Sequence, residues 1–147
     1  MTTLTLDQAA RIVDSALQKA RELGLKPMTV AVLDAGGHLV AFKREDASGI
    51  LRPDIAQGKA WGALGMGLGG RALAARAASH PVFFGALAAA SGGRVIPVPG
   101  GVIIRNPSGH VLGAVGISGD LPDQDEACAI AGIESVRLQA DPGADTH

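Results

Sequence analysis

The sequence is poor in the features that mark several large classes of protein. Its single cysteine, Cys128, excludes an internal disulfide and fits a reducing compartment. No apolar run approaches the roughly 18 residues that a membrane-spanning helix needs. The N-terminus lacks the basic segment followed by an apolar block that marks a signal peptide. These absences predict a cytoplasmic protein with no membrane partner.

Aromatic residues, net charge and metal-ligand motifs are also scarce. The chain has three Phe, one Trp, no Tyr and a net charge of −1. Nucleic-acid binding usually needs a basic patch and aromatic stacking platforms, so nucleic acid is not an expected partner. The four histidines form neither an HExxH motif nor a clustered ligand spacing, and no CxxCH motif is present. No dedicated metal site is therefore predicted.

Apolar and small residues are abundant instead. The 147 residues are 47% apolar and only 18% charged, and 21 of them are glycine. This length predicts one domain, with a core over about residues 5–139 and a frayed tail over residues 140–147. The composition is apolar for a monomer. We therefore expect a homo-oligomer whose subunit contacts bury the excess.

Hydrophobic spacing predicts the element order helix, hairpin, helices, hairpin, helix. A capping box at Thr5 and Gln8 begins a helix that ends at Gly24. The other expected elements are strands at 28–33 and 38–43, helices at 54–67, 71–78 and 81–90, strands at 102–104 and 111–117, and a helix from 122 to about 138. Strands joined as hairpins favour an antiparallel sheet with helices packed on it, an α+β fold. The second hairpin is expected at the centre of that sheet.

A Pro-Gly-Gly segment precedes this central hairpin. Pro99, Gly100 and Gly101 lead into its first strand, and glycines also interrupt its second strand. Glycine inside a strand usually marks a bulge, or a point where backbone or ligand approaches closely. We interpret the Pro-Gly-Gly segment as one wall of a ligand site.

Two cations near the second predicted helix are candidate site residues. The helical neighbours of Lys59 are apolar or small, so its ammonium projects from an apolar face. The side chain either extends along that face to solvent or serves as an anchoring or catalytic cation. In the second case its partner is Asp54 or a ligand carboxylate. Arg52, just before this helix, is the second candidate for binding an anion.

Two histidines are candidates for ligation or proton transfer. His38 lies beside a Gly-Gly turn. His80 directly precedes Pro81 at the start of a predicted helix, and Phe83 and Phe84 follow. A histidine near aromatic rings can bind haem iron or act as an acid or base, and either histidine can also be purely structural. We expect the Pro-Gly-Gly segment, the Lys59 helix and the segment 80–84 to converge on one pocket near a subunit boundary.

Four stretches together resemble a known family. They are VAVLDAGGHLVAF, DIAQGKAWGAL, VIPVPGGVIIRNPSGHVLGAVGISG and DLPDQDEACAIAGIE. They are similar to the small GlcG/HbpS-type family, labelled haem-binding or haem-degrading and related to the C-terminal part of PduO-type corrinoid adenosyltransferases. The resemblance runs from about Leu6 to Leu138. It implies a profilin-like fold with a five-stranded antiparallel sheet flanked by helices, and dimers that build larger oligomers, often octamers.

Two hypotheses about function follow from these residues and this resemblance. The first is a binding protein for haem or a related tetrapyrrole, in which His38 or His80 offers iron a ligand. The second is a small oligomeric enzyme of lyase, isomerase or hydrolase type that acts on a small organic acid or ring compound. In that enzyme Lys59 and Arg52 would hold the anion while a histidine moves protons. A Soret band on haemin titration favours the first hypothesis, and a carboxylate bound at the Pro-Gly-Gly segment favours the second.

Overall fold

The fold, in a computed structural model that describes residues 3–143, is a single sheet with helices on both faces. The helices are α1 (Leu6–Glu22), α2 (Arg52–Met66), α3 (Gly70–Ser79), α4 (Pro81–Ala90) and α5 (Pro122–Ser135). The strands are β1 (Thr29–Asp34), β2 (Leu39–Arg44), β3 (Gly101–Arg105), β4 (Val111–Ser118) and β5 (Gln139–Asp141). Among these described elements, no helix is long and apolar enough to cross a membrane.

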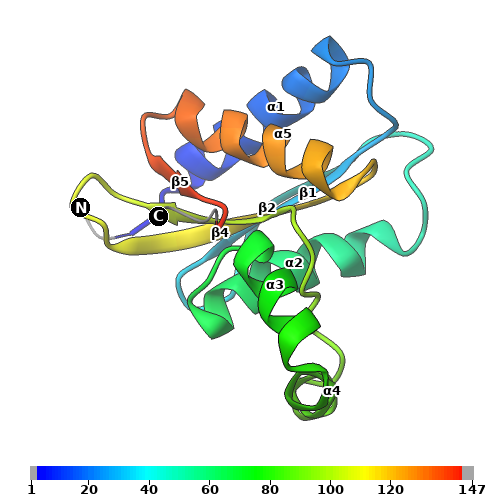
Figure 1. The fold of residues 1–147 in the computed structure, drawn as a ribbon. Coiled ribbons are helices and arrows are strands. Elements are labelled where there is room, and N and C mark those ends of the chain that lie inside the picture. The colour runs from blue at the N-terminus through cyan, green and yellow to red at the C-terminus, as the bar shows by residue number, and fades with distance from the viewer. Residues whose placement is uncertain (1–2, 144–147) are drawn as a thin grey trace.

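The sheet has the order β2-β1-β4-β3-β5, and all its neighbouring strands are antiparallel. Helices α1 and α5 cover one face and α2 covers the other, while α3 and α4 project away from the sheet on the side of α2 (Figure 1). Strand β4 of the second hairpin lies at the centre. The structure thus confirms the α+β fold and the five-stranded antiparallel sheet, and it is consistent with the profilin-like fold that the resemblance implied.

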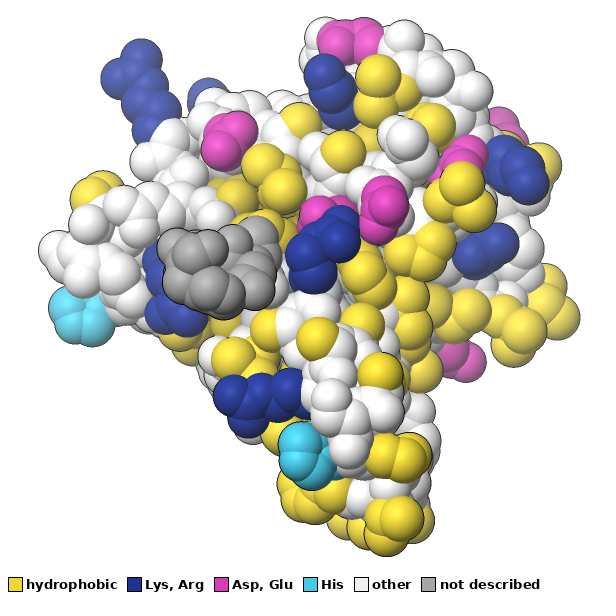
Figure 2. Space-filling model, in the orientation of Figure 1, with side chains coloured by type: hydrophobic (Ala, Val, Ile, Leu, Met, Phe, Trp, Pro, Cys, Tyr) yellow, Lys and Arg dark blue, Asp and Glu magenta, His cyan; other side chains and the backbone are white. Residues whose placement is uncertain are grey.

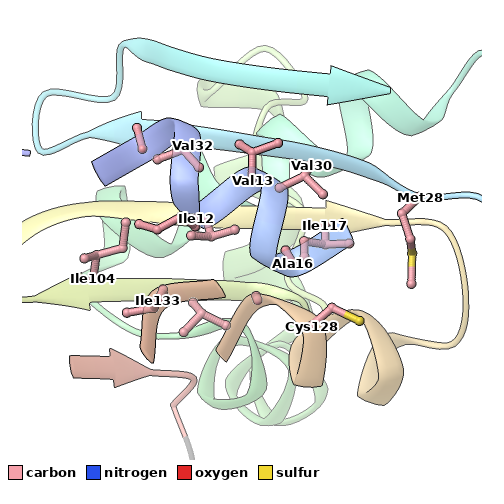
Figure 3. Close-up of a cluster of buried hydrophobic side chains, with 14 of the residues drawn as sticks. Ile12, Val13, Ala16, Met28, Val30, Val32, Ile104, Ile117, Cys128 and Ile133 are labelled. Atoms are coloured by element: carbon pink, nitrogen blue, oxygen red, sulfur yellow. The ribbon is translucent and has the colours of Figure 1, made fainter. Parts of the chain in front are cut away.

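The core forms where α1 and α5 pack on the sheet (Figure 3). On α1, the predicted Thr5–Gln8 capping box is present, and Ile12, Val13 and Ala16 are buried at helical spacing. The strands add side chains of alternate residues, so that Val30 points to this core while Leu33 packs against α2 on the other face. Strands buried on both faces need continuous apolar runs, which β1, β3 and β4 supply.

Glycines in β3 and β4 let α2 lie unusually close to the sheet. A Cβ atom at Gly116 would collide with the carbonyl oxygen of Ala56, and one at Gly101 would collide with that of Lys59. The close approach that the strand glycines predicted is therefore made by the backbone of α2. This packing fixes the position from which the Lys59 side chain extends into the interior.

The chain after α5 differs from the sequence prediction. Helix α5 ends at Ser135 rather than near Leu138, because Arg137 adopts a left-handed conformation with φ of 63° and turns the chain back. Residues 139–141 then pair with β3, and Arg105 binds Asp141 at 2.9 Å. Residues 140 and 141 are therefore an edge strand, and the prediction of a frayed tail there is wrong. Residues 144–147 of that predicted tail lie outside the described residues.

Two boundaries near the candidate site also differ. Helix α2 begins at Arg52, with Pro53 in its first turn, so Asp54 lies inside the helix and does not cap it. Proline is favoured there because the first helical N–H groups have no partner within the helix. Strand β2 begins at Leu39, which places His38 in the turn rather than in the strand.

Candidate functional site

Lys59 is buried and paired. Its side chain is only 4% exposed, and Nζ donates to the carbonyl oxygen of Ile117 at 2.9 Å and to Oδ2 of Asp125 at 3.2 Å. The expected alternatives of extension to solvent and pairing with Asp54 are both wrong. Asp125 lies 66 positions away in the sequence, on α5. The ammonium thus links α2 on one face of the sheet to α5 on the other.

Gly100 makes room for this link. It has φ of 118°, and a Cβ atom there would lie 2.8 Å from Nζ of Lys59. Both Gly100 and Gly101 are buried, and Pro99 is half-buried. The structure therefore brings the Pro-Gly-Gly segment and Lys59 together, as expected. The Lys59 side chain passes close to the backbone of Gly100, where a larger residue would leave no room.

Burial dominates the electrostatics of this ion pair. It lowers the pKa of Lys59, and the neighbouring carboxylate of Asp125 acts in the opposite direction. Burial likewise raises the pKa of Asp125, against the effect of Lys59 and of the Asp120 backbone N–H that Oδ1 accepts at 2.9 Å. Two groups that each resist ionisation alone stabilise one another's charge.

Arg52 lies at the same end of the sheet. Its Nη1 donates to Oγ of Ser118 at 2.9 Å, and its positive charge further lowers the pKa of Lys59. The two predicted anion-binding cations are therefore electrostatic neighbours. The Asp125 carboxylate already compensates the ammonium.

His80, Phe83 and Phe84 line a cavity of about 360 Å³ at the junction of α3 and α4. Met66, Ala75, Arg76 and Ser79 complete its lining, which is mainly apolar. The two phenyl rings stand edge to face, 5.6 Å apart at 84°, with Phe84 buried and Phe83 54% exposed. A histidine, an arginine and two aromatic rings therefore share one recess.

This cavity is separate from the Pro-Gly-Gly segment. The first residue of α3, Gly70, lies against the carbonyl oxygen of Val98, beside that segment. His80 follows the last residue of the same ten-residue helix, which spans about 15 Å. Figure 1 shows α4 at the end of the projection, away from the sheet. The structure thus joins two parts of the predicted pocket and places the third elsewhere.

His38 lies in the β1–β2 turn, beside a different cavity. Its Nδ1 is 3.1 Å from Oδ1 of Asp34, and its side chain is 80% exposed. Partial burial acts to raise the pKa of Asp34, but hydrogen bonds from His38 and from the Gly36 N–H hold it below its usual value. The cavity, of about 320 Å³, also contacts Leu4 and Leu112.

Sequence reasoning missed a fourth region, between α2 and the loop after α4. There the guanidinium of Arg94 lies 3.9 Å from the centre of the Trp61 ring. The helical spacing of Asp54, Gln57 and Trp61 could have shown that these three share a face of α2. No local signal indicates that Arg94 packs on it.

Two further features bear on chemistry. Cys128 is fully buried, as expected of a small hydrophobic residue, and burial raises the pKa of its thiol to about 11, so the thiolate is scarce at neutral pH. Within residues 3–143, no cluster of three or more His, Cys, Asp or Glu side chains is arranged to hold a metal ion.

Comparison with known proteins finds relatives that match most of the chain. A curated protein of Citrobacter freundii, an uncharacterised 15.0 kDa protein from the dhaT-dhaS intergenic region, is 28% identical over 91% of this chain and 92% of its own. The Klebsiella pneumoniae protein ORFY has a TM-score of 0.82 at 27% identity, covering 91% of this chain and 90% of its own. PduOC, in a crystal structure of its haem complex, has a TM-score of 0.83 at 24% identity, covering 92% and 96%.

The family assignment rests on a match over most of the chain. The model of the HbpS-like haem-degrading proteins matches residues 4–134, which run from before α1 to the last turn of α5 and leave out β5. The chain therefore belongs to the family of HbpS-like haem-degrading proteins.

Proposed function

We propose that this protein binds haem or a related tetrapyrrole in the cavity between α3 and α4. The observation that carries the proposal is the joint presence of His80, Arg76 and two phenylalanines around one largely apolar recess. The description of the family and the haem complex of the structurally similar PduOC support the same ligand class.

The residues present suit a tetrapyrrole. A flat apolar macrocycle would contact Phe83 and Phe84, whose perpendicular rings offer one face and one edge. The His80 imidazole can offer a nitrogen to iron, as a proximal histidine does. Arg76 lies one helical turn before it and can pair with a propionate. Bound haem would supply a redox-active iron to this recess.

No observation specifically favours the alternative enzyme. That hypothesis needs Lys59 and Arg52 to hold an anion beside a histidine. Lys59 is instead compensated by Asp125, and His80 lies at the far end of α3. A single domain and a cytoplasmic location stay predictions of the sequence.

Haemin titration tests the binding site. We expect wild-type protein to develop a Soret band, and His80→Ala to lose the histidine-ligated spectrum with affinity reduced by about tenfold or more. Arg76→Gln should weaken binding less, by about threefold to tenfold, because only a propionate pairing is lost.

His38→Ala is the matched control for this titration. It also removes a solvent-exposed imidazole, but from the β1–β2 turn, so its Soret band should equal that of the wild type. A band unchanged in His80→Ala and lost in His38→Ala would move the site to that turn. Absence of any Soret band in wild-type protein would reject haem as the ligand.

We also propose that the chain assembles, from dimers up to octamers, through its projecting end. Hydrophobic side chains gather there (Figure 2), where Val82 is 87% exposed and α4 packs mainly against α3. In sedimentation velocity, wild-type protein should exceed the monomer mass of 14.8 kDa, and Val82→Asp should shift it towards monomer. Leu6→Asp, at a site 67% exposed on α1, should leave the mass unchanged. A wild-type monomer at micromolar concentration would contradict the proposal.

A further inference from the structure

A cavity of about 390 Å³, distinct from those beside His80 and His38, lies between α2, the β1–β2 turn and the loop that follows α4. Asp54, Gln57 and Trp61 face it from α2, at helical positions i, i+3 and i+7. Leu33 of β1 joins Trp61 in an apolar wall, because both pack on the same side of the sheet. None of these residues belongs to the His80 cavity.

Arg94 supplies a positively charged group to this cavity. Its guanidinium stacks on Trp61 at 3.9 Å, and its Nε donates to the carbonyl oxygen of Ser91 at 2.9 Å. These two contacts fix the plane of the guanidinium. Within residues 3–143, its two terminal nitrogens make no hydrogen bond or ion pair, so their donors are available to a ligand.

Acceptor groups come from α2. Asp54 forms no ion pair within 4.0 Å with Arg94 or with any other cation of residues 3–143. Gln57 donates from Nε2 to the carbonyl oxygen of Pro53 at 3.3 Å, which leaves Oε1 as an acceptor. The cavity therefore presents a cation and an anion that do not neutralise each other.

The Trp61 side of the cavity is held in place by the β1–β2 turn. Gly37 has φ of 85°, and a Cβ atom there would lie 3.2 Å from two atoms of the Trp61 indole. The turn can approach the ring because this residue is glycine. Trp61 is thus fixed between the turn and Arg94, as a preorganised binding wall requires.

We propose that this cavity binds a small zwitterion of the α-amino-acid type with an apolar side chain. The carboxylate pairs with the terminal nitrogens of Arg94, and the ammonium is bound by Asp54 and by Oε1 of Gln57. The apolar side chain packs on Leu33 and Trp61. A ligand with only one of the two charges leaves an unmatched charged group in the cavity. This proposal is independent of haem binding.

Intrinsic fluorescence gives a direct test, because Trp61 is the only tryptophan and the chain has no tyrosine. We expect L-leucine to cause a saturable change in emission, with a Kd of roughly 10 μM to 1 mM. The α-keto acid of leucine lacks the ammonium and isopentylamine lacks the carboxylate. Each should bind about tenfold more weakly or worse, because one charge-assisted contact is lost.

Variants locate the response. Arg94→Gln and Asp54→Asn should each weaken leucine binding by about tenfold or more, measured by calorimetry because removal of Arg94 itself alters Trp61 emission. Arg11→Gln removes an exposed guanidinium of α1 and should bind leucine as the wild type does. Haemin titration of Arg94→Gln should match the wild type, which keeps failure of this proposal distinct from failure of haem binding.

Three results would overturn the proposal. One is the absence of a saturable response to leucine, methionine or phenylalanine up to about 10 mM, a concentration well above the expected Kd. Another is equal binding of leucine and its two singly charged analogues. The third is full leucine binding by Arg94→Gln and Asp54→Asn.

Discussion

Lys59→Met should lower the free energy of unfolding by about 3–5 kcal/mol, the cost of breaking a buried ion pair from one side. The Asp125 side chain is 1% exposed and would stay buried without its cation. The carbonyl oxygen of Ile117 would lose the donor that Lys59 gives it. Urea denaturation followed by circular dichroism measures the loss, through the shift of the midpoint at unchanged slope.

An exposed lysine on strand β2 is the control. Lys43 binds Asp14 at 2.7 Å, but both side chains are 60% exposed. Surface pairs of this kind contribute about 0–1 kcal/mol, so Lys43→Met should cost little. Equal effects of the two substitutions would show that burial adds nothing to the Lys59 contact. The double variant Lys59→Met/Asp125→Asn should lose less than Lys59→Met alone, because it buries no charge.

The pH dependence of Lys59→Met has a defined sign. Burial already raises the pKa of Asp125 above its unfolded value, and removal of the lysine removes an effect that opposed the rise. An acid whose pKa is higher in the folded state stabilises the fold below its unfolded pKa, and that stability is lost as pH rises through the folded value. The deficit of Lys59→Met should therefore be smaller near about pH 4 than at about pH 7.

The elements that the sequence predicted well are those with local determinants. Helix α1 follows from a capping box that begins at Thr5 and from one apolar stripe along its 17 residues. The two hairpins follow from β-branched runs around turn residues. The family resemblance supplied the number of strands, but not the place of the fifth. Strand β5 has only three residues. Its pairing with β3 depends on a left-handed conformation at Arg137, which no sequence pattern predicts.

The candidate site was only partly predictable because its contacts are distant in the sequence. The apolar surroundings marked Lys59 as unusual, but its partner Asp125 lies on a helix across the sheet. His80 and Phe84 were correctly placed near each other because they share one helical turn. No sequence pattern around Arg94 predicts that it belongs to a site. Its role appears only when the loop after α4 folds back over Trp61.

Gly116→Val should abolish stable folding, and Gly116→Ala alone should cost about 3 kcal/mol or more, at the upper end of overpacking effects. Gly116 is in β4, the central strand, and faces α2. A Cβ atom there would collide with the carbonyl oxygen of Ala56 and lie 2.9 Å from the backbone nitrogen of Ala60. Both atoms belong to helix backbone, so no side-chain rotation relieves the contact, and α2 as a whole must move.

Displacement of α2 would also disturb the approach of Lys59 to Asp125. The steric clash and the weakened ion pair would then both destabilise the fold. Thermal unfolding followed by circular dichroism should show a large fall in the midpoint for Gly116→Ala. Gly65→Ala is the matched control, because it adds the same methyl group to an exposed position of α2 with no atom within 4 Å. It should instead gain about 0.5–1 kcal/mol, since alanine favours the helix over glycine. An unchanged midpoint for Gly116→Ala would mean that α2 is not held against β4 as closely as this packing requires.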